Sequence, residues 1–228
     1  YNDYISQGYS ESESTQYALE DADKYAPKPW CGYTDWRDIM FQKGSHSNYE
    51  TNVSGGNDRA KYYASLGYMN QEGITLNSGL RRISARVNTE FKATNHFTFG
   101  LNTMFSDVKQ DAFSEGTSYT SPFYSTVSKV TPSDPGYNED GSWNRDFIGN
   151  GDRNPLLSMK YDSKKEYVTR FMNTLWGEYE FIDNLKFKST LSYDYQINKS
   201  RNWYDPRTSN GDDYNGLEED YMYERKKF

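Results

Sequence analysis

The sequence predicts an all-β fold built as an antiparallel meander, on three observations. Between Tyr49 and Phe105, four runs of residues alternate between apolar and polar side chains, as strands with two different faces do. Aromatic residues make up 17% of the 228 residues, with 22 Tyr and 12 Phe, which suits strands better than a helical bundle. The turns between the runs are alternately tight and open, as expected for strands that run up and down beside their neighbours.

Composition excludes several classes of protein. No apolar run approaches the roughly 20 residues of a membrane-spanning helix, whereas a barrel strand needs only about 10 alternating residues. The formal charge of -7 argues against binding to nucleic acid. Cys31 is the only cysteine, so no intrachain disulfide is expected. Two classes remain, a soluble all-β domain or part of an outer-membrane barrel. Because Tyr1 is not an initiator, we expect a mature segment or an excerpt of a longer chain.

Residues 1–46 are expected to form a polar lead-in with a short helix and a loop. The helix is predicted from Thr15 to Tyr25, with Ser14 as its N-cap and Pro27 closing it. Apolar residues at helical spacing predict a further helical turn within residues 35–41.

Residues 47–106 are predicted to form four antiparallel strands. The third strand has the clearest alternation, with Ile83 and Phe91 on one face and Arg82 and Glu90 on the other. Glycines and asparagines predict tight turns after the first and third strands. The four predicted strands cover residues 47–53, 61–70, 80–92 and 97–106.

The remaining segments are predicted to be a long loop, a hairpin and a second loop. Residues 107–165 carry weak patterning and four prolines; such a loop is uncommon in a compact soluble domain but ordinary on the outer side of a large barrel. Alternation returns in residues 166–199, a hairpin with a tight turn at Asp183-Asn184, and residues 200–228 give a loop and the start of a further strand. Short turns at one end and long connections at the other favour an outer-membrane barrel, with its long loops extracellular.

An ordered series of motifs resembles the SusC-like family of TonB-dependent outer-membrane transporters, which import glycans and some peptides. The series covers most of the chain from Thr34 to Asn198. It consists of Thr34-Asp35-Trp36-Arg37-Asp38 with Phe41, Asn52-Val53-Ser54-Gly55-Gly56-Asn57, Tyr62-Tyr63, Ser65-Leu66-Gly67-Tyr68, Gln71-Glu72-Gly73-Ile74, Asn77-Ser78, Arg82, Arg86-Val87-Asn88, Pro135-Gly136-Tyr137, Asp140-Gly141-Ser142 and Asn154-Pro155-Leu156.

The resemblance implies an arc of a large, 22-stranded transmembrane β-barrel in the cell outer membrane, whose lumen is closed by a plug. It also implies uptake of glycans with a SusD-like lipoprotein as a lid, and energy from the TonB complex through parts absent from these residues. The chain contains neither a plug nor a TonB box, so an internal barrel segment in contact with outer-membrane lipid is expected. Neither enzymatic activity nor a cofactor is expected.

Aromatic residues in the loops are the candidate substrate-binding residues. Sugar rings have apolar faces that stack on Trp and Tyr side chains. The candidates are Tyr124, Tyr137, Trp143 and Trp203, and Tyr119 and Phe123 lie in the same stretches. For each residue the alternative is packing within the loop or contact with the lid protein.

No catalytic or metal-binding residue is predicted. His46 and His96 are far apart in the sequence, and Asn138-Glu139-Asp140-Gly141 matches only a fragment of a calcium loop. Three alternatives remain open. A soluble carbohydrate-binding β-sandwich would cover its apolar face with a second sheet, a peptide importer would belong to the same transporter family, and a surface glycosidase would hydrolyse its ligand.

Overall fold

The computed structural model divides the chain into two compact units. The sheet unit comprises residues 43–112, 163–203 and 218–228, and the loop unit comprises residues 1–42, 113–162 and 204–217. The structure describes residues 2–25, 34–113, 124, 126, 130, 132, 134–144, 154–208 and 210–228.

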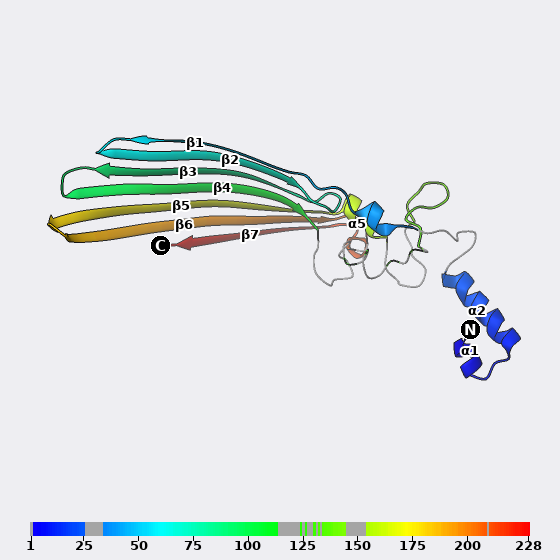
Figure 1. The fold of residues 1–228 in the computed structure, drawn as a ribbon. Coiled ribbons are helices and arrows are strands. Elements are labelled where there is room, and N and C mark those ends of the chain that lie inside the picture. The colour runs from blue at the N-terminus through cyan, green and yellow to red at the C-terminus, as the bar shows by residue number, and fades with distance from the viewer. Residues whose placement is uncertain are drawn as a thin grey trace. The chain divides into compact units, whose positions relative to one another are not determined.

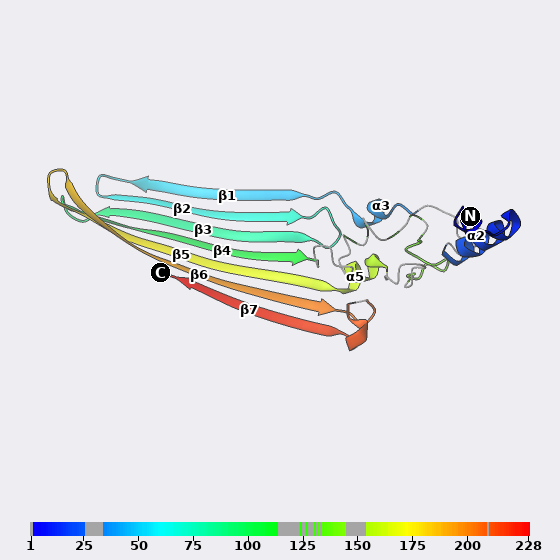
Figure 2. The same ribbon diagram turned by 90° about the horizontal axis from the view of Figure 1, so that it is seen from below.

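The sheet unit is a single antiparallel sheet of seven strands whose order in space is their order along the chain (Figures 1 and 2). The fold class predicted from the sequence is therefore confirmed. Several strands run further than predicted, so both ends of the predicted loop 107–165 are strand. The strands are β1 (His46–Gly56), β2 (Ala60–Glu72), β3 (Gly79–Lys92), β4 (Phe97–Ala112), β5 (Ser163–Ile182), β6 (Leu185–Tyr204) and β7 (Leu217–Lys227).

Tight turns join the strands at one end of the sheet, and longer connections join them at the other. In the β1–β2 turn, the side chain of Asn57 accepts the N–H groups of Arg59 and Ala60, both at 2.9 Å. The β5–β6 turn is Asp183-Asn184, where Asn184 adopts a positive φ of 67° that asparagine tolerates. The long connections cover residues 73–78, 113–162 and 205–216.

Strand register places the apolar side chains on one face. One row crosses five strands by direct pairing: Leu66 with Ala85, Ala85 with Phe105, Phe105 with Phe171, and Phe171 with Tyr195. Because side chains alternate along a strand, register of this kind gathers the apolar residues at alternate positions of neighbouring strands on the same side. This face is an apolar surface that extends across β1 to β6.

The apolar face is exposed. The exposed fraction of the side chain is 50% for Leu175 and 65% for Leu191. Soluble monomers rarely expose a continuous apolar surface of this kind. The described residues form one sheet, and the second sheet that a β-sandwich would need is not found among them.

The apolar face ends before the strands do. In β5 it runs from Phe171 to Phe181, and towards the long connections the same face carries charged residues instead. Eleven residues extend roughly 35 Å, which at the usual tilt of barrel strands spans an apolar band of about 25 Å. The strands thus continue past the hydrocarbon region of a bilayer. The charged residues beyond the band are Glu72, Arg81, Asp107, Lys109, Asp111, Lys165, Lys199 and Arg201.

Aromatic rings gather on the apolar face near the tight turns. Phe99 stacks on Phe91 with ring centroids 5.6 Å apart and on Phe97 at 5.9 Å. Tyr179 lies 6.5 Å from Phe97 and 4.9 Å from Phe181. Such a belt is typical of the membrane interface of outer-membrane barrels.

The opposite face of the sheet is polar. Arg170 donates two hydrogen bonds to Asp194, from Nε at 2.9 Å and from Nη2 at 2.8 Å. The indole of Trp176 lies over Gly100 on the neighbouring strand, where a Cβ atom would come within 2.6 Å of it. Charged and amide side chains of this type suit a face turned to water.

The loop unit contains α1 (Asn2–Ser6), α2 (Glu11–Tyr25), α3 (Trp36–Met40), α5 (Pro155–Tyr161) and η1 (Asp212–Tyr214). None of the helices in the described part of the chain has the length and hydropathy of a membrane-spanning segment. Pro27 and Cys31 lie outside the described residues.

Helix α2 begins earlier than predicted, and Ser14 is not its cap. Ser10 and Glu13 form a capping box, in which the Ser10 N–H donates to Glu13 Oε2 at 3.0 Å and the Glu13 N–H to Ser10 Oγ at 3.4 Å. Ser14 lies inside the helix and its N–H donates to the Ser10 carbonyl at 2.8 Å. The prediction was wrong because the Ser-x-x-Glu spacing starts the helix four residues upstream.

A small core holds the loop unit together. The buried apolar residues of the described chain are Trp36 and Met40 from α3 with Leu156, Leu157 and Met159 from α5. The indole of Trp36 also donates to the carbonyl of Asp134 at 3.1 Å. The helical turn predicted in residues 35–41 is confirmed, whereas α5 was not predicted within the long loop.

Candidate ligand-binding site

A short hairpin in the loop unit presents two of the predicted aromatic residues. Tyr137 and Trp143 form an antiparallel β-bridge. Between them the Asn138 N–H donates to the Ser142 carbonyl at 2.8 Å, and Gly141 takes the positive φ of 78° that the turn requires. The two rings therefore come from opposite arms of one hairpin.

The carboxylate of Asp140 belongs to the turn of this hairpin. It accepts the backbone N–H of Ser142 at 2.9 Å. Hydrogen bonds from Ser142 lower the pKa of Asp140, so its charge persists to more acidic pH. The segment that resembled a fragment of a calcium loop thus forms a tight turn.

The Tyr137 and Trp143 rings lie side by side. Their centroids are 4.8 Å apart and their planes are inclined by 35°. Tyr137 keeps 46% of its surface exposed. Trp143 is half-buried, and a pair of rings that is partly open to water can accept a flat apolar surface of a ligand.

Asn154 ties the base of this hairpin to the start of α5. Its Nδ2 donates to the carbonyls of Gly136 at 2.8 Å and Asn144 at 2.9 Å, while its Oδ1 accepts the N–H of Leu156 at 2.9 Å as the N-cap of α5. Asn154 is 1% exposed, so its amide forms these bonds away from water. The ring pair is therefore carried on a fixed support.

The last turn of α5 adds a cation and a third ring to the site. Tyr161 meets Trp143 edge to face, with centroids 6.4 Å apart. The ammonium of Lys160 lies 4.7 Å from the centre of the Trp143 ring, and the guanidinium carbon of Arg207 lies 3.6 Å from the centre of the Tyr161 ring. Both contacts are cation–π interactions.

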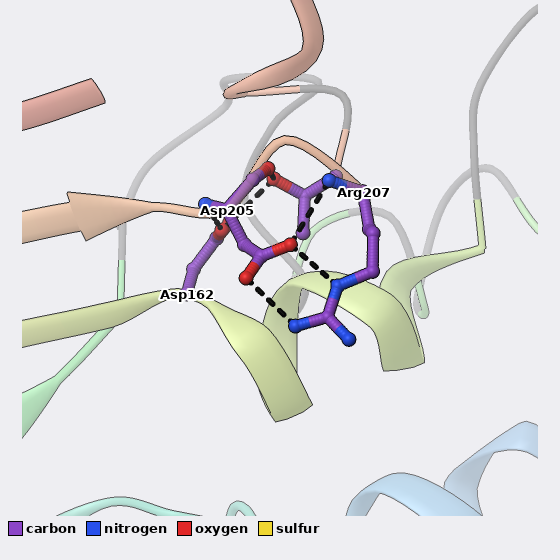
Figure 3. A network of polar contacts seen from close by, with 4 residues as sticks. Asp162, Asp205 and Arg207 are labelled. Atoms are coloured by element: carbon purple, nitrogen blue, oxygen red, sulfur yellow. Dashed lines mark hydrogen bonds and ion pairs between the residues drawn. The ribbon is translucent and has the colours of Figure 1, made fainter. Parts of the chain in front are cut away.

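Arg207 is held in place by a network of carboxylates, shown in Figure 3. Asp205 accepts two hydrogen bonds from Arg207, from Nε at 2.6 Å and from Nη2 at 2.8 Å. Asp162 in turn accepts the Asp205 N–H at 2.9 Å, the Thr208 hydroxyl at 2.8 Å and the Asn210 amide at 2.9 Å. Burial raises the pKa of Asp162 although these hydrogen bonds oppose the shift. One carboxylate thus organises the whole turn that carries Arg207.

Trp143, Tyr161 and Arg207 line a hollow of about 560 Å³, whereas Tyr137 and Lys160 touch the Trp143 ring without lining the hollow. Its volume lies within the range of about 300–1,000 Å³ that is usual for small-ligand sites. It offers the rings of Trp143 and Tyr161, amide groups and the guanidinium of Arg207, all of which can bind a ligand. The lining residues are Asn138, Ser142, Trp143, Asn144, Leu157, Tyr161 and Arg207.

The other predicted residues lie elsewhere. Trp203 lies in β6 of the sheet unit, opposite Ser163, and not in a loop. Tyr124 is half-buried at a helical position of the loop unit. Tyr119 and Phe123 lie outside the described residues.

Sequence reasoning missed five residues around the hollow: Lys160, Tyr161, Asp162, Asp205 and Arg207. One signal was available, because Asn154 followed by Pro155 is an N-cap with proline in the first turn and marks the start of a helix. No pattern in the sequence links residue 162 to residues 205–210.

No protein-family model matches the chain. Among curated proteins, the TonB-dependent receptor P3 of Formosa agariphila is 32% identical over 166 residues, which cover 70% of this chain and 16% of the receptor. The TonB-dependent receptor SusC of Bacteroides thetaiotaomicron is 24% identical over 182 residues, 71% of this chain and 18% of SusC. The chain therefore spans about a sixth of the length of the relatives it matches.

Solved structures agree with the fold. A structure of the RagAB peptide transporter matches 95% of this chain and 26% of its own chain with a TM-score of 0.70 and 16% sequence identity. The RagAB peptide importer in its closed-closed state matches 78% of this chain and 20% of its own with a TM-score of 0.63 and 19% identity. By sequence and by fold, the chain belongs to the SusC-like TonB-dependent receptors and corresponds to a segment of their outer-membrane β-barrel.

Proposed function

We propose that this chain supplies wall and extracellular vestibule to a transporter that imports oligosaccharides. The observation that carries the proposal is the pair of rings of Tyr137 and Trp143 beside a hollow whose lining includes amide groups. Long connections lie on the extracellular side in outer-membrane barrels, which supports assigning the loop unit to the side from which a ligand would arrive.

The chemistry of the hollow suits sugars. A pyranose ring has an apolar face that covers an aromatic ring, and its hydroxyls need donors and acceptors at the edge. Asn138, Ser142 and Asn144 provide such groups beside Trp143. The support from Asn154 keeps the rings in position before the ligand arrives, which lowers the entropic cost of binding.

Transport would follow from capture at this site. A SusD-like lipoprotein would act as a lid that encloses the ligand between itself and the vestibule. The TonB complex would then supply energy through parts of the receptor outside these residues. The polar face of β1–β7 would line the lumen, and the apolar face would contact lipid.

Import of peptides is the second candidate. The solved structures with this fold include the RagAB peptide importer, although identities of 16–19% support the fold alone. A peptide would use the same rings for its aromatic side chains and the same amides for its backbone. The two candidates therefore differ in ligand and not in architecture.

The proposal is tested with the full-length receptor and its lipoprotein in detergent. Binding of maltohexaose, xylohexaose, oligogalacturonate and a mixed peptide digest is measured by calorimetry for wild type, Trp143→Ala and Trp143→Phe. We expect one class of oligosaccharide to bind, the Ala variant to lose about tenfold in affinity, and the Phe variant to keep most of it because a ring remains.

Two results would count against the proposal. Binding of peptides without oligosaccharides would favour the second candidate. Equal affinity of Trp143→Ala and wild type for every bound sugar would remove the hollow from the binding site. Recovery of the sugars intact after incubation is also expected, since a glycosidase would cleave them.

A further inference from the structure

The hollow has an uneven charge. The polar groups that line it are amides, a hydroxyl and the guanidinium of Arg207, and no carboxylate is among the described lining residues. The nearest turn carries Glu139 and Asp140, but neither lines the hollow, and Asp140 already accepts the Ser142 N–H. An acidic ligand would therefore meet no carboxylate among the described residues that line the hollow.

Lys160 contributes a cation directly at the rings. Its ammonium lies 4.7 Å from the centre of Trp143 and 5.6 Å from the centre of Tyr161. In the described part of the chain no carboxylate forms an ion pair with Lys160, which is exposed at the end of α5. A long flexible stem lets this ammonium move aside from the ring face while staying beside it.

Arg207 provides a second cation whose position is fixed. Asp205 holds two of its nitrogen atoms, and Asp162 holds the backbone of Asp205 and the hydroxyl of Thr208. Both carboxylates thus lie behind Arg207 and are engaged by these donors. The charge of Arg207 is offset locally by Asp205, whereas the charge of Lys160 is not offset by a described partner.

We propose that the hollow selects oligosaccharides that carry an acidic group, either a uronic carboxylate or a sulfate ester. The sugar ring would cover Trp143, and the acidic group would project from the edge of the ring towards Lys160. Lys160 is therefore the residue that determines specificity, and Arg207 is a positioned second donor. This inference rests on the proposed import of oligosaccharides and names their class.

The test compares ligands of equal length and different charge on the full-length receptor with its lipoprotein. Oligogalacturonate, a sulfated galactan oligosaccharide and a neutral galactan oligosaccharide are titrated into wild type, Lys160→Gln, Lys160→Arg and the control Lys199→Gln. Lys199 lies in β6 and, unlike Lys160, has no described contact with the rings of Trp143 or Tyr161. Its variant therefore removes one positive charge and leaves the cation at these rings in place.

We expect wild type to bind an acidic oligosaccharide more tightly than the neutral one. Lys160→Gln should weaken acidic binding by about three- to tenfold and leave neutral binding unchanged, because one charge-assisted contact is lost. Lys160→Arg should retain acidic binding, and the gap between Lys160→Gln and wild type should shrink as salt is added. The uronate and sulfate arms show which acid the site prefers.

Several results would overturn the inference. An equal loss of affinity for the acidic oligosaccharide in Lys160→Gln and Lys199→Gln would show a general effect of charge. Unchanged affinity for it in Lys160→Gln would show that Lys160 does not bind the acidic group. Tight neutral binding that depends on Trp143 would refute the acidic class while leaving oligosaccharide import standing. If only acidic peptides bind in a Lys160-dependent way, both the inference and the proposed import of sugars fail.

Discussion

Asp162 shows at the scale of one residue how burial and hydrogen bonding compete. Leaving water disfavours its charged form, whereas the donors from Asp205, Thr208 and Asn210 favour it. The balance raises the pKa, which means that the folded turn binds a proton more tightly than the unfolded chain does. Ionisation of the carboxylate therefore costs some of the stability of the turn.

The stability of the 205–210 turn should therefore depend on pH. Ionisation of Asp162 costs nothing below its ordinary pKa of 3.8, where the carboxyl is protonated in both the folded and the opened turn. The full cost applies above the raised pKa of the folded turn. The free energy of opening the turn should therefore fall as the pH rises from the ordinary to the raised pKa. Hydrogen exchange of this turn, corrected for intrinsic rates, should show that fall in wild type. Asp162→Asn cannot titrate and should lack it; the same pH dependence in both proteins would contradict this account.

Gly100 lies so close to the Trp176 indole that a larger residue would clash with it. A Cβ atom there would come within 2.6 Å of the Trp176 indole and of the Thr89 carbonyl. Gly100→Ala should therefore destabilise the full-length barrel by about 1–3 kcal/mol, as overpacking does. Gly177→Ala is the control, because its Cβ would meet Phe97 at 3.4 Å, an ordinary contact. Urea unfolding followed by tryptophan fluorescence compares the two; equal stability would contradict the close contact.

At the scale of elements, the hairpin and helix α5 depend on a shared residue. Asn154 caps α5 and also bonds both ends of the hairpin that carries Tyr137 and Trp143. The two elements should therefore loosen together when this amide is removed.

Asn154→Ala should remove the cap, at about 1 kcal/mol, and remove the side-chain donor to the carbonyls of Gly136 and Asn144. We expect faster hydrogen exchange in residues 136–144 and 156–161 together, in the full-length receptor. Ser10→Ala is the matched control, since it removes the capping box of α2 and should accelerate exchange in α2 alone. Faster exchange in α5 without change in the hairpin would show that the two are independent.

The sequence predicts most of the sheet and only part of the hollow. Strands β1 to β6 could be predicted from alternation, because a strand with one apolar face has an apolar residue at every second position. The ends of β4 and β5 were missed, since beyond Phe105 the outward face becomes charged and the alternation disappears. The hollow was only half predicted. Tyr137 and Trp143 stood out as loop aromatics, but the pairing of Asp162 with residues 205–210 joins distant segments and leaves no local pattern.

At the scale of the whole molecule, the sheet presents two environments at once. Its apolar face matches the thickness of a hydrocarbon layer, and the opposite face carries charges such as the pair of Arg170 and Asp194. The side to which a residue points should then decide the effect of a charge placed there.

Leu191 and Ser192 make this comparison directly, as adjacent exposed residues of β6 on opposite faces. Leu191→Arg should destabilise the full-length barrel by about 2–4 kcal/mol, because Leu191 lies near the middle of the apolar band. Ser192→Arg should have a much smaller effect. Unfolding in lipid vesicles measures both; equal tolerance of the two variants would contradict a lipid-facing surface.

The way Asn154 anchors both ends of the Tyr137–Trp143 hairpin also affects how the sequence of this hairpin can change among related receptors. Asn154 bonds the backbone carbonyls of Gly136 and Asn144, so the anchoring does not depend on the side chains between them. Substitutions at 137–143 can therefore accumulate while the anchor stays the same, provided that the turn at Gly141 is kept. Residues 137–143 can therefore be exchanged as a unit, and grafting them between homologous receptors is a direct way to transfer ligand preference from one receptor to another.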